Sequence, residues 1–297
     1  MNAEKHTVAV IGLGSMGMGA ARSCIKAGLK TYGVDINHDT LQTLKESGAK
    51  GVSKDCIDFA PELDSILLLV VNAKQVKKLL FEDNLADNLR PDTAVMVSAT
   101  ISADDARQIE VLLKERNLIM LDAPVSGGAA KAEKGEMTIM ASGSDQAFDK
   151  LKPVLDATGD KVYRIGSEIG MGATVKIIHQ LLAGIHIAAG AEAMAMAAKS
   201  KIPLDLMYEV VTNAAGNSWM FENRMKHVVD GDYAPKSMVD IFVKDLGLVT
   251  DTAQSINFPL HLGSTAFQMF TSASNAGHGP EDDSAVIKIF KGIDLPE

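Results

Sequence analysis

Three polar side chains stand at the start of the most apolar segment of the chain, which runs from Val175 to Ala198. They are Lys176, His179 and Gln180, and offsets of three and four residues place such positions on neighbouring parts of one helix face. Burial favours the neutral form of a lysine, which can then accept a proton from a substrate hydroxyl. Histidine and glutamine can hold further hydroxyls, because buried polar groups need partners. The cluster predicts proton transfer on a polar substrate; the alternative is a lysine that extends its charge into water.

Other residues of this segment are assigned plainer tasks. His179 is an alternative base, because imidazole titrates near neutral pH. We expect His186 and Glu192 in packing or in an interface, and Met194 and Met196 in the core. The segment is long enough to cross a membrane, but its charged and polar residues would be poorly tolerated by lipid. We therefore expect a buried helix between two domains, and no membrane partner.

A second set of candidate residues forms a glycine turn near the N-terminus. The run Gly12-Leu13-Gly14-Ser15-Met16-Gly17 matches GxGxxG, between a predicted strand at Thr7–Ile11 and a predicted helix. The first glycine allows a tight turn, the second lets the backbone approach a pyrophosphate, and the third lets the helix pack on the strand. The N–H groups at the helix start would bind the phosphates. This context predicts a dinucleotide site.

Asp35 follows the next predicted strand, 18 residues after Gly17. The acid that binds the adenosine ribose lies about 20 residues after such a turn. A capping or turn residue is the alternative interpretation of Asp35. A carboxylate here would repel the 2′-phosphate of NADP, and the segment 35–39 has no arginine to neutralise that phosphate. The prediction is therefore NAD rather than NADP, bound either by an enzyme or by a non-catalytic NAD-sensing protein.

Three further polar segments follow predicted strands or separate predicted helices. Ser126, Gly127 and Gly128 come after the predicted strand Leu118–Leu121 and would present a hydroxyl and backbone N–H groups to a carboxylate; a glycine turn with a capping serine is the alternative. Thr100 also follows a strand and is either a helix cap or a cofactor contact. A polar break between two helices supplies candidates to line a substrate cleft: Asn213, Asn217, Ser218 and Trp219.

The elements that must position these residues fall into two classes. The first half alternates strands with helices, which predicts βαβ units in a doubly wound parallel sheet. The predicted strands are Thr7–Ile11, Thr31–Val34, Ser65–Val71, Thr93–Ser98, Leu118–Leu121, Thr138–Ala141 and Lys161–Arg164. Everything after Gly166 is predicted to be helical: Ala173–Lys199, Leu204–Asn213, Trp219–Val229, Val239–Ser255 and His261–Asn275. The fold class is thus α/β: a domain built on this sheet at residues 1–168, a long interdomain helix, and an all-helical domain at residues 169–297.

Bulk properties narrow the partners. A net charge of −9 over 297 residues argues against nucleic-acid binding, which needs a basic face. Only Cys24 and Cys56 occur, without a Cys/His cluster at metal-ligand spacing, so we expect no metal and a reducing cytoplasm. The short apolar run at the N-terminus leads directly into glycines and is not expected to be a secretory signal.

Five motifs in this order resemble the β-hydroxyacid dehydrogenase family, which includes 3-hydroxyisobutyrate, tartronate-semialdehyde and 6-phosphogluconate dehydrogenases. The motifs are IGLGSMG (11–17), DAPVSGG (122–128), KGEMTIMASG (134–143), GMGATVK (170–176) and KDL (244–246). The resemblance covers nearly the whole chain. It implies a Rossmann domain and a helical domain, with a homodimer or homotetramer formed through the latter.

The resemblance also implies roles for individual residues. The catalytic lysine of the family falls on Lys176, and its substrate-binding SGG falls on Ser126, Gly127 and Gly128. Cofactor contacts fall on the glycine turn (Gly12, Leu13, Gly14, Ser15, Met16, Gly17), Asp35, Val71, Asn72, Thr100 and Lys244. Since neighbouring helix residues do not face each other, Lys244 and Asp245 are expected to do different jobs.

Two departures from the family bear on the substrate. His179 and Gln180 stand where the family commonly has two adjacent asparagines, and Val71-Asn72 stands where it usually has Leu-Pro. In the first departure, the pair His179-Gln180 is similar to the branch of the family that oxidises C2 of a four-carbon sugar acid. It implies NAD-dependent oxidation of L-threonate to 2-oxo-tetronate, with His179 and Gln180 binding substrate hydroxyls. The alternatives are tartronate-semialdehyde reduction and 3-hydroxyisobutyrate oxidation.

Overall fold

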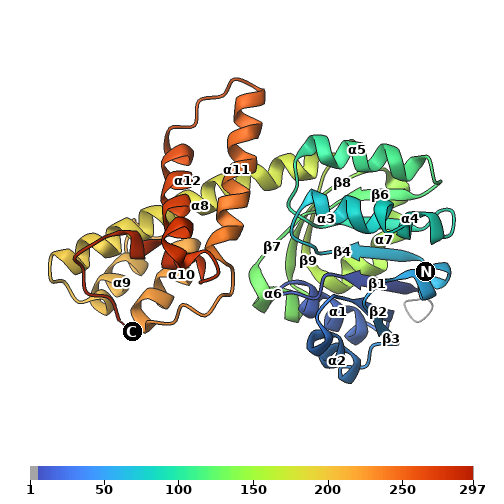
Figure 1. Cartoon of the computed structure of the whole chain (residues 1–297), viewed down its shortest axis with the longest axis horizontal. Helices are drawn as coiled ribbons and strands as arrows, with labels where there is room; N and C mark the ends of the chain where they lie inside the picture. The colour runs from blue at the N-terminus through green and yellow to red at the C-terminus, as the bar shows by residue number, and fades with distance from the viewer. Residues whose placement is uncertain (1–5, 297) are drawn as a thin grey trace. The chain divides into compact units, whose positions relative to one another are not determined.

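The structure is a computed structural model and describes residues 6–296. The chain divides into two compact units, one that ends at Lys176 and one that begins at Ile177 (Figure 1). The first contains a sheet covered by helices and the second is helical. The predicted α/β fold class, with a Rossmann-like sheet followed by helices, is confirmed.

The sheet of the first unit runs in the order β3-β2-β1-β4-β5-β6-β8-β7, with β9 paired to β8. Its strands are β1 (Thr7–Ile11), β2 (Lys30–Val34), β3 (Gly51–Ser53), β4 (Ser65–Leu68), β5 (Ala94–Val97), β6 (Ile119–Asp122), β7 (Val125–Ser126), β8 (Met137–Ser142) and β9 (Gly159–Gly166). Strands β1 to β6 pair in parallel, whereas β8 is antiparallel to both β6 and β7. The predicted parallel sheet is thus confirmed for β1 to β6, and β8 adds antiparallel pairs with β6 and β7 at the edge.

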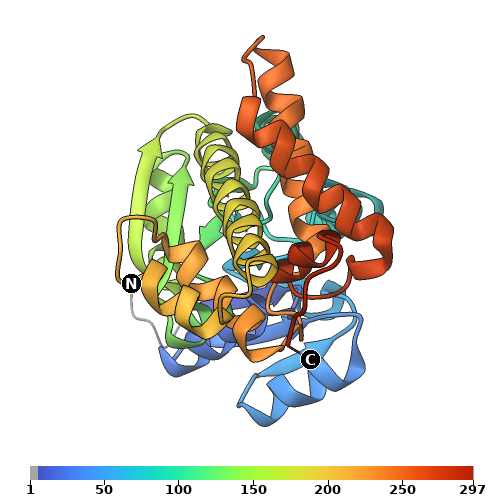
Figure 2. The same cartoon turned by 90° about the vertical axis from the view of Figure 1, so that its left-hand side faces the viewer.

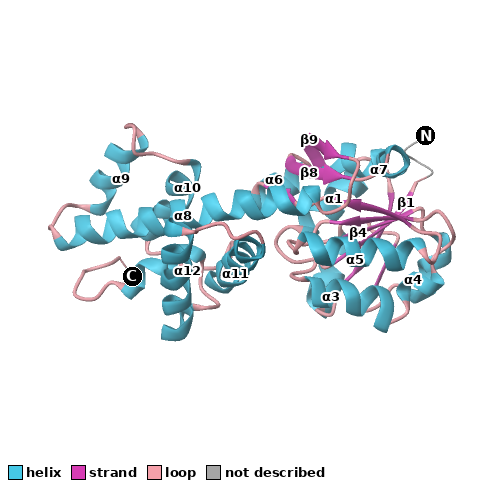
Figure 3. Ribbon diagram, turned by 90° about the horizontal axis from the view of Figure 1, so that it is seen from above, coloured by secondary structure: helices cyan, strands magenta, loops and turns pink. Residues whose placement is uncertain are grey.

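Helices cover both faces of the sheet, as Figure 3 shows. These are α1 (Gly17–Lys26), α2 (His38–Glu46), η2 (Ile57–Glu62), α3 (Ala73–Lys77), η3 (Lys78–Glu82), α4 (Leu85–Asn88), α5 (Ala103–Lys114), α6 (Gly128–Lys134) and α7 (Asp145–Thr158). Alternation along the strands divides the apolar residues between two cores. Ile11 and Leu68 face one core with α3, α4 and α5, while Val10 and Leu67 face the other with α1, α2 and α7.

Strand β4 is shorter than predicted, because the apolar run Ser65–Val71 leaves the sheet after Leu68. The Leu69 N–H still donates to the Ile11 carbonyl (2.8 Å), and the chain then passes beside the glycine turn. The apolar residues continue past Leu68 because the loop after the strand packs against the glycine turn. The apolar pattern alone therefore does not mark the end of the strand.

The helical unit is built on the long helix α8 (Met171–Lys199), whose first residues belong to the first unit. In Figure 2, α8 is yellow and the orange and red helices of the unit pack around it. The other elements are α9 (Leu204–Thr212), α10 (Trp219–Asp230), α11 (Val239–Ser255), α12 (His261–Ala273), η4 (Ser274–His278) and η5 (Asp283–Ile289). By length and composition α8 could cross a membrane, but 56% of its apolar window is buried within the protein, as in a core helix.

One expectation for the helical unit is wrong. Met194 is fully buried as expected, but Met196 is 73% exposed. After α12, the short 3-10 helix η5 is buried among α10, α11 and α12. Its Asp283 is fully buried and forms an ion pair with Arg224 (2.7 Å). Pairing of this kind is what allows a charged residue to lie in a core.

Candidate active site

The glycine turn lies at the carboxyl end of β1, where the order of strands reverses. Strand β1 has β2 on one side and β4 on the other, and open α/β sheets bind ligands at such a switch point. The Gly12 N–H donates to Val34 O at the end of β2 (2.9 Å), which holds the turn against the neighbouring strand. The glycine turn predicted to bind the cofactor therefore lies at the carboxyl ends of the strands, where such sheets bind ligands.

The three glycines fit the backbone of a dinucleotide turn. Gly12 has φ +88°, and a Cβ there would lie 2.9 Å from the Leu69 carbonyl oxygen. A Cβ on Gly17 would lie 1.8 Å from Gly12 O, so α1 can start this close to the turn only with glycine. A Cβ on Gly14 would meet nothing within 4 Å. Gly14 thus faces open space, which is the room that a pyrophosphate needs at the start of α1.

Asp35 is held by the same turn. Its Oδ2 accepts from the Leu13 N–H (2.7 Å) and its Oδ1 from the Asn37 N–H (2.9 Å). The cap of α2 is Asn37, so the capping alternative for Asp35 is wrong, although its bond to Asn37 closes a local turn. The carboxylate remains partly exposed beside Ile36, whose side chain is 88% exposed. A carboxylate fixed at the edge of the turn is placed to accept hydrogen bonds from a ribose.

The remaining cofactor candidates follow β4 and β5. Asn72 caps α3, because its Oδ1 accepts from the Gln75 N–H (2.9 Å). Val71 is 44% exposed, and its N–H donates to Gln75 Oε1 (2.8 Å). Thr100 is not the cap of α5, since Ser102 has that position and accepts from the Asp105 N–H (3.0 Å). The capping alternative for Thr100 is therefore wrong.

The second glycine loop lies between β7 and α6. Ser126 belongs to β7 and pairs with Thr138 of β8. Gly127 (φ +126°) occupies the N-cap position of α6, and Gly128 has φ +70°. The alternative in which Ser126 caps the helix is wrong, because α6 has no side-chain cap. The two positive φ values explain why the loop requires glycine.

Lys176 is 6% exposed, so it does not extend to water as a surface lysine would. The start of its helix is anchored to the sheet by Asp122, whose Oδ2 accepts from the Gly170 N–H (3.0 Å) and the Ala173 N–H (2.9 Å). The Gly172 N–H donates to Ser142 Oγ (3.0 Å), and a Cβ on Gly172 would lie 2.5 Å from Met140 O. The GMG sequence thus permits close packing that fixes the backbone one turn before the lysine.

Asp122 was missed as a functional candidate, although it heads the DAPVSGG motif. It is 1% exposed, and burial raises its pKa to about 6, against the opposing effect of its hydrogen bonds to Ala173, Gly170 and Ser142. An acid at the end of a strand, followed by a helix start rich in glycine, was the available signal. A carboxylate at a helix start satisfies N–H groups that have no partner within the helix.

In the helical unit, four of the singled-out side chains form a chain of contacts. Gln180 Nε2 donates to Asp245 Oδ2 (2.6 Å), and Gln180 Oε1 lies 3.0 Å from His179 Nδ1. Lys244 Nζ lies 2.6 Å from Asp245 Oδ1. The expectation that Lys244 and Asp245 do not face each other is therefore wrong. Helix geometry separates their Cβ atoms, but the four-carbon stem of lysine is long enough to fold back.

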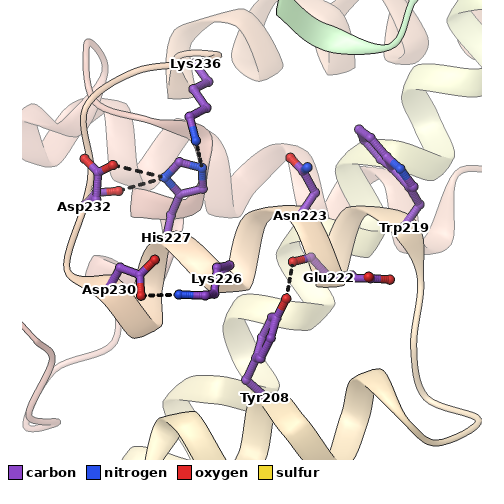
Figure 4. Close-up of a pocket in the computed structure, with 9 residues that line it drawn as sticks. All are labelled: Tyr208, Trp219, Glu222, Asn223, Lys226, His227, Asp230, Asp232 and Lys236. Atoms are coloured by element: carbon purple, nitrogen blue, oxygen red, sulfur yellow. Dashed lines mark hydrogen bonds and ion pairs between the residues drawn. The ribbon is translucent and has the colours of Figure 1, made fainter. Parts of the chain in front are cut away.

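A pocket of about 360 Å³ lies elsewhere in the helical unit, around α10 (Figure 4). Lys236 points to His227 in that view, with Nζ 3.2 Å from Nε2. Its lining residues are Tyr208, Trp219, Glu222, Asn223, Lys226, His227, Asp230, Asp232 and Lys236. Of the expected cleft residues only Trp219 lines it, while Ser218 caps α10. Its carboxylates outnumber its lysines, which disfavours the binding of an anion.

Comparison with known proteins gives one family match for each half of the chain. Residues 7–166 match the NAD binding domain of 6-phosphogluconate dehydrogenase, and residues 170–290 match the NAD-binding domain of NADP-dependent 3-hydroxyisobutyrate dehydrogenase. The chain is 72% identical over 293 residues to an L-threonate dehydrogenase from Pectobacterium atrosepticum, covering 98% of this chain and 96% of that one. The chain belongs to the 3-hydroxyisobutyrate dehydrogenase family.

Two other members of the family are similar to this chain over nearly its full length. An L-threonate dehydrogenase of Escherichia coli K12 is 68% identical over 290 residues, 97% of this chain and 96% of the relative. A Salmonella typhimurium crystal structure described as 3-hydroxyisobutyrate dehydrogenase is 64% identical, with a TM-score of 0.94 over 96% of this chain and 100% of that one. This chain is thus an NAD-binding hydroxyacid dehydrogenase, and the comparison favours an enzyme over a non-catalytic NAD-sensing protein.

Proposed function

We propose that this chain oxidises L-threonate at C2 to 2-oxo-tetronate with NAD. The observation that carries the proposal is identity of 68–72% over nearly the whole chain to L-threonate dehydrogenases of two organisms. Bound NAD would supply the acceptor for the hydride that leaves C2. The Lys176 amine accepts the C2 hydroxyl proton as the carbonyl forms, and in the reverse direction its ammonium returns that proton. The burial of Lys176 and its rigid helix start support this role.

The remaining residues bind and orient. The glycine turn, Asp35, Val71, Asn72, Thr100 and Lys244 hold the cofactor, and Ser126, Gly127 and Gly128 hold the substrate carboxylate. His179 and Gln180 recognise substrate hydroxyls. The spacing of Lys176, His179 and Gln180 on one face of helix α8 supports their contact with the same substrate molecule.

Three wider features belong to the same proposal. The domain boundary lies near residue 168, supported by family matches that end at 166 and begin at 170. The compact units divide at Lys176 instead, because the first turn of α8 is bonded to the sheet through Asp122 and Ser142. The enzyme acts in the cytoplasm as a homodimer or homotetramer.

Initial rates with a panel of acids test the substrate. At equal concentration, L-threonate should give the highest kcat/KM among L-threonate, D-erythronate, glycerate and 3-hydroxyisobutyrate. The Salmonella structure makes 3-hydroxyisobutyrate the second candidate. A higher kcat/KM for 3-hydroxyisobutyrate would contradict the proposed substrate while leaving the reaction class intact.

Initial rates with the two cofactors test Asp35. NAD should be preferred over NADP by at least about 10-fold in kcat/KM, because the Asp35 carboxylate repels the 2′-phosphate. Asp35→Asn should narrow that ratio, and Asp55→Asn, at an exposed carboxylate in another turn, serves as the control. A wild-type preference for NADP would contradict the assignment.

A further inference from the structure

The distances determine which atom donates and which accepts in a chain of contacts that joins four side chains: Lys244, Asp245, Gln180 and His179. Asp245 is 2% exposed and Gln180 is 8% exposed, so neither side chain can readily exchange these partners for water. Lys244 Nζ lies 2.6 Å from one Asp245 oxygen, and the other oxygen lies 2.6 Å from the Gln180 amide. An ionised carboxylate has no proton to donate and can only accept hydrogen bonds.

The Asp245 carboxylate fixes the orientation of the Gln180 amide. An amide end has one oxygen and one NH2 group, and its orientation follows from its partners. The reversed orientation would place the Gln180 oxygen 2.6 Å from a carboxylate oxygen, a contact between two acceptors. The NH2 group must therefore face Asp245, which turns Oε1 toward His179.

Gln180 in turn fixes the tautomer of His179. Its Oε1 lies 3.0 Å from His179 Nδ1 and has no proton to give, so Nδ1 must donate. In a neutral imidazole with Nδ1 protonated, Nε2 carries the lone pair and is an acceptor. His179 is exposed, although it follows a buried lysine by only three residues on α8.

We propose that Asp245 is a positioning residue that, through Gln180, holds His179 as a hydrogen-bond acceptor at Nε2, and that this acceptor selects acids bearing a hydroxyl beyond the reacting carbon. The inference rests on the proposed function and assigns the substrate preference to one ring nitrogen. A hydroxyl donates to Nε2, whereas a methyl or methylene group leaves that nitrogen without a substrate donor. A site built to bind a hydroxyl rejects an analogue that lacks it.

The test is the ratio of kcat/KM for L-threonate to that for 2-hydroxybutyrate of the same C2 configuration, which lacks both distal hydroxyls. Using one cofactor for both acids cancels any effect of Lys244 or Asp245 on NAD. His179→Phe should reduce the ratio by about 10-fold or more, the value of one hydrogen bond. His179→Gln, which can again place an amide oxygen near the Nε2 position, should restore part of it.

Coupling between the positions separates positioning from plain loss of structure. Asp245→Asn allows the Gln180 amide to reverse, and it should lower the ratio in the wild-type background but not in the His179→Phe background. Equal effects of Asp245→Asn in both backgrounds would overturn the relay. An unchanged ratio in His179→Phe would overturn the assigned selectivity while threonate oxidation stands. A wild-type enzyme that does not oxidise L-threonate would instead reject the proposed function.

A spectroscopic measurement tests the tautomer without activity. In ¹⁵N-histidine-labelled protein, with His179→Phe used for assignment, Nδ1 of His179 should show the protonated shift and Nε2 the unprotonated one at high pH. Asp245→Asn should increase the population with Nε2 protonated. A wild-type His179 protonated at Nε2 would overturn the inference even if every variant folded poorly.

Discussion

Asp122 is a buried side chain that connects the sheet to the start of helix α8. It lies at the end of β6 and accepts two N–H groups from the start of α8, which carries Lys176. Its burial raises its pKa from 3.8 to about 6, which corresponds to about 3 kcal/mol between the folded and unfolded chains. Below pH 4 both states hold the proton, whereas between pH 4 and 6 only the folded state does.

We predict that this part of the free energy of unfolding is lost as the pH rises from about 4 through 6, because the folded state binds more protons in that range. Asp122→Asn keeps an amide oxygen for Gly170 and Ala173 but cannot titrate. Urea unfolding across this range should show a pH-dependent difference between wild type and Asp122→Asn, with the wild type losing more stability as the pH rises. Parallel pH profiles for the two proteins would contradict the assignment.

For single residues, the sequence predicted the burial of Lys176 correctly but did not predict which side chains contact one another. Lys176 was expected to be buried, and the structure confirms it, because the residues around it are apolar. The Lys244–Asp245 ion pair was missed, since helix spacing describes Cβ directions and not the reach of a long side chain. Met196 was placed in the core on hydrophobicity alone, yet its position on α8 faces outward.

At the scale of elements, the glycine turn separates two roles that a sequence motif combines. Gly17 is required by packing, because any Cβ would clash with Gly12 O, whereas Gly14 faces open space. A substitution at Gly17 should therefore destabilise the fold, whereas a substitution at Gly14 should weaken cofactor binding.

We predict that Gly17→Ala lowers the melting temperature by several degrees, because backbone must move to accept the new methyl group. Gly14→Ala should leave the melting temperature within about 1–2 degrees and weaken NAD binding by about 10-fold or more, because the methyl group occupies the expected pyrophosphate space. Thermal unfolding with and without NAD, and calorimetric titration, measure both effects. Unimpaired NAD binding by Gly14→Ala would contradict the placement of the pyrophosphate.

Regular periodicity predicted most elements, and the misses have local causes. Helix α11 runs over Val239–Ser255 as expected, because its apolar positions repeat at helical spacing and Pro259 follows. Strand β7 has only two residues and β3 only three, which is too short for an alternating pattern. The direction of β8 depends on the connection at residues 123–136, which contains β7 and α6 and returns the chain antiparallel to β6 and β7, and no pattern within β8 states its direction.

At the scale of the whole molecule, helix α8 presents apolar residues that its own unit does not cover. Ile178, Leu182 and Met196 are 60%, 56% and 73% exposed, and they lie at spacings that repeat along one face. Exposed apolar rows of this kind mark association surfaces. This supports the proposed homo-oligomer.

We predict that Leu182→Glu combined with Met196→Glu shifts the protein to a smaller species, because two carboxylates would be buried in the interface. Gln254→Glu, at an exposed polar position of α11, is the matched control for added negative charge. Light scattering after gel filtration measures the mass. An unchanged oligomer in the double variant would show that this face is not the interface.

The role of Lys176 as the general base is tested most directly by the rate of NADH formation from L-threonate by wild type and by Lys176→Ala, with NAD affinity measured on the same preparations. Lys199→Ala, at the other end of α8, is the control and should keep wild-type rates. We predict that Lys176→Ala loses about 10²–10⁴-fold in kcat, the usual contribution of a general acid–base, while it folds and binds NAD as the wild type does. Threonate turnover at the wild-type rate in Lys176→Ala would contradict this role.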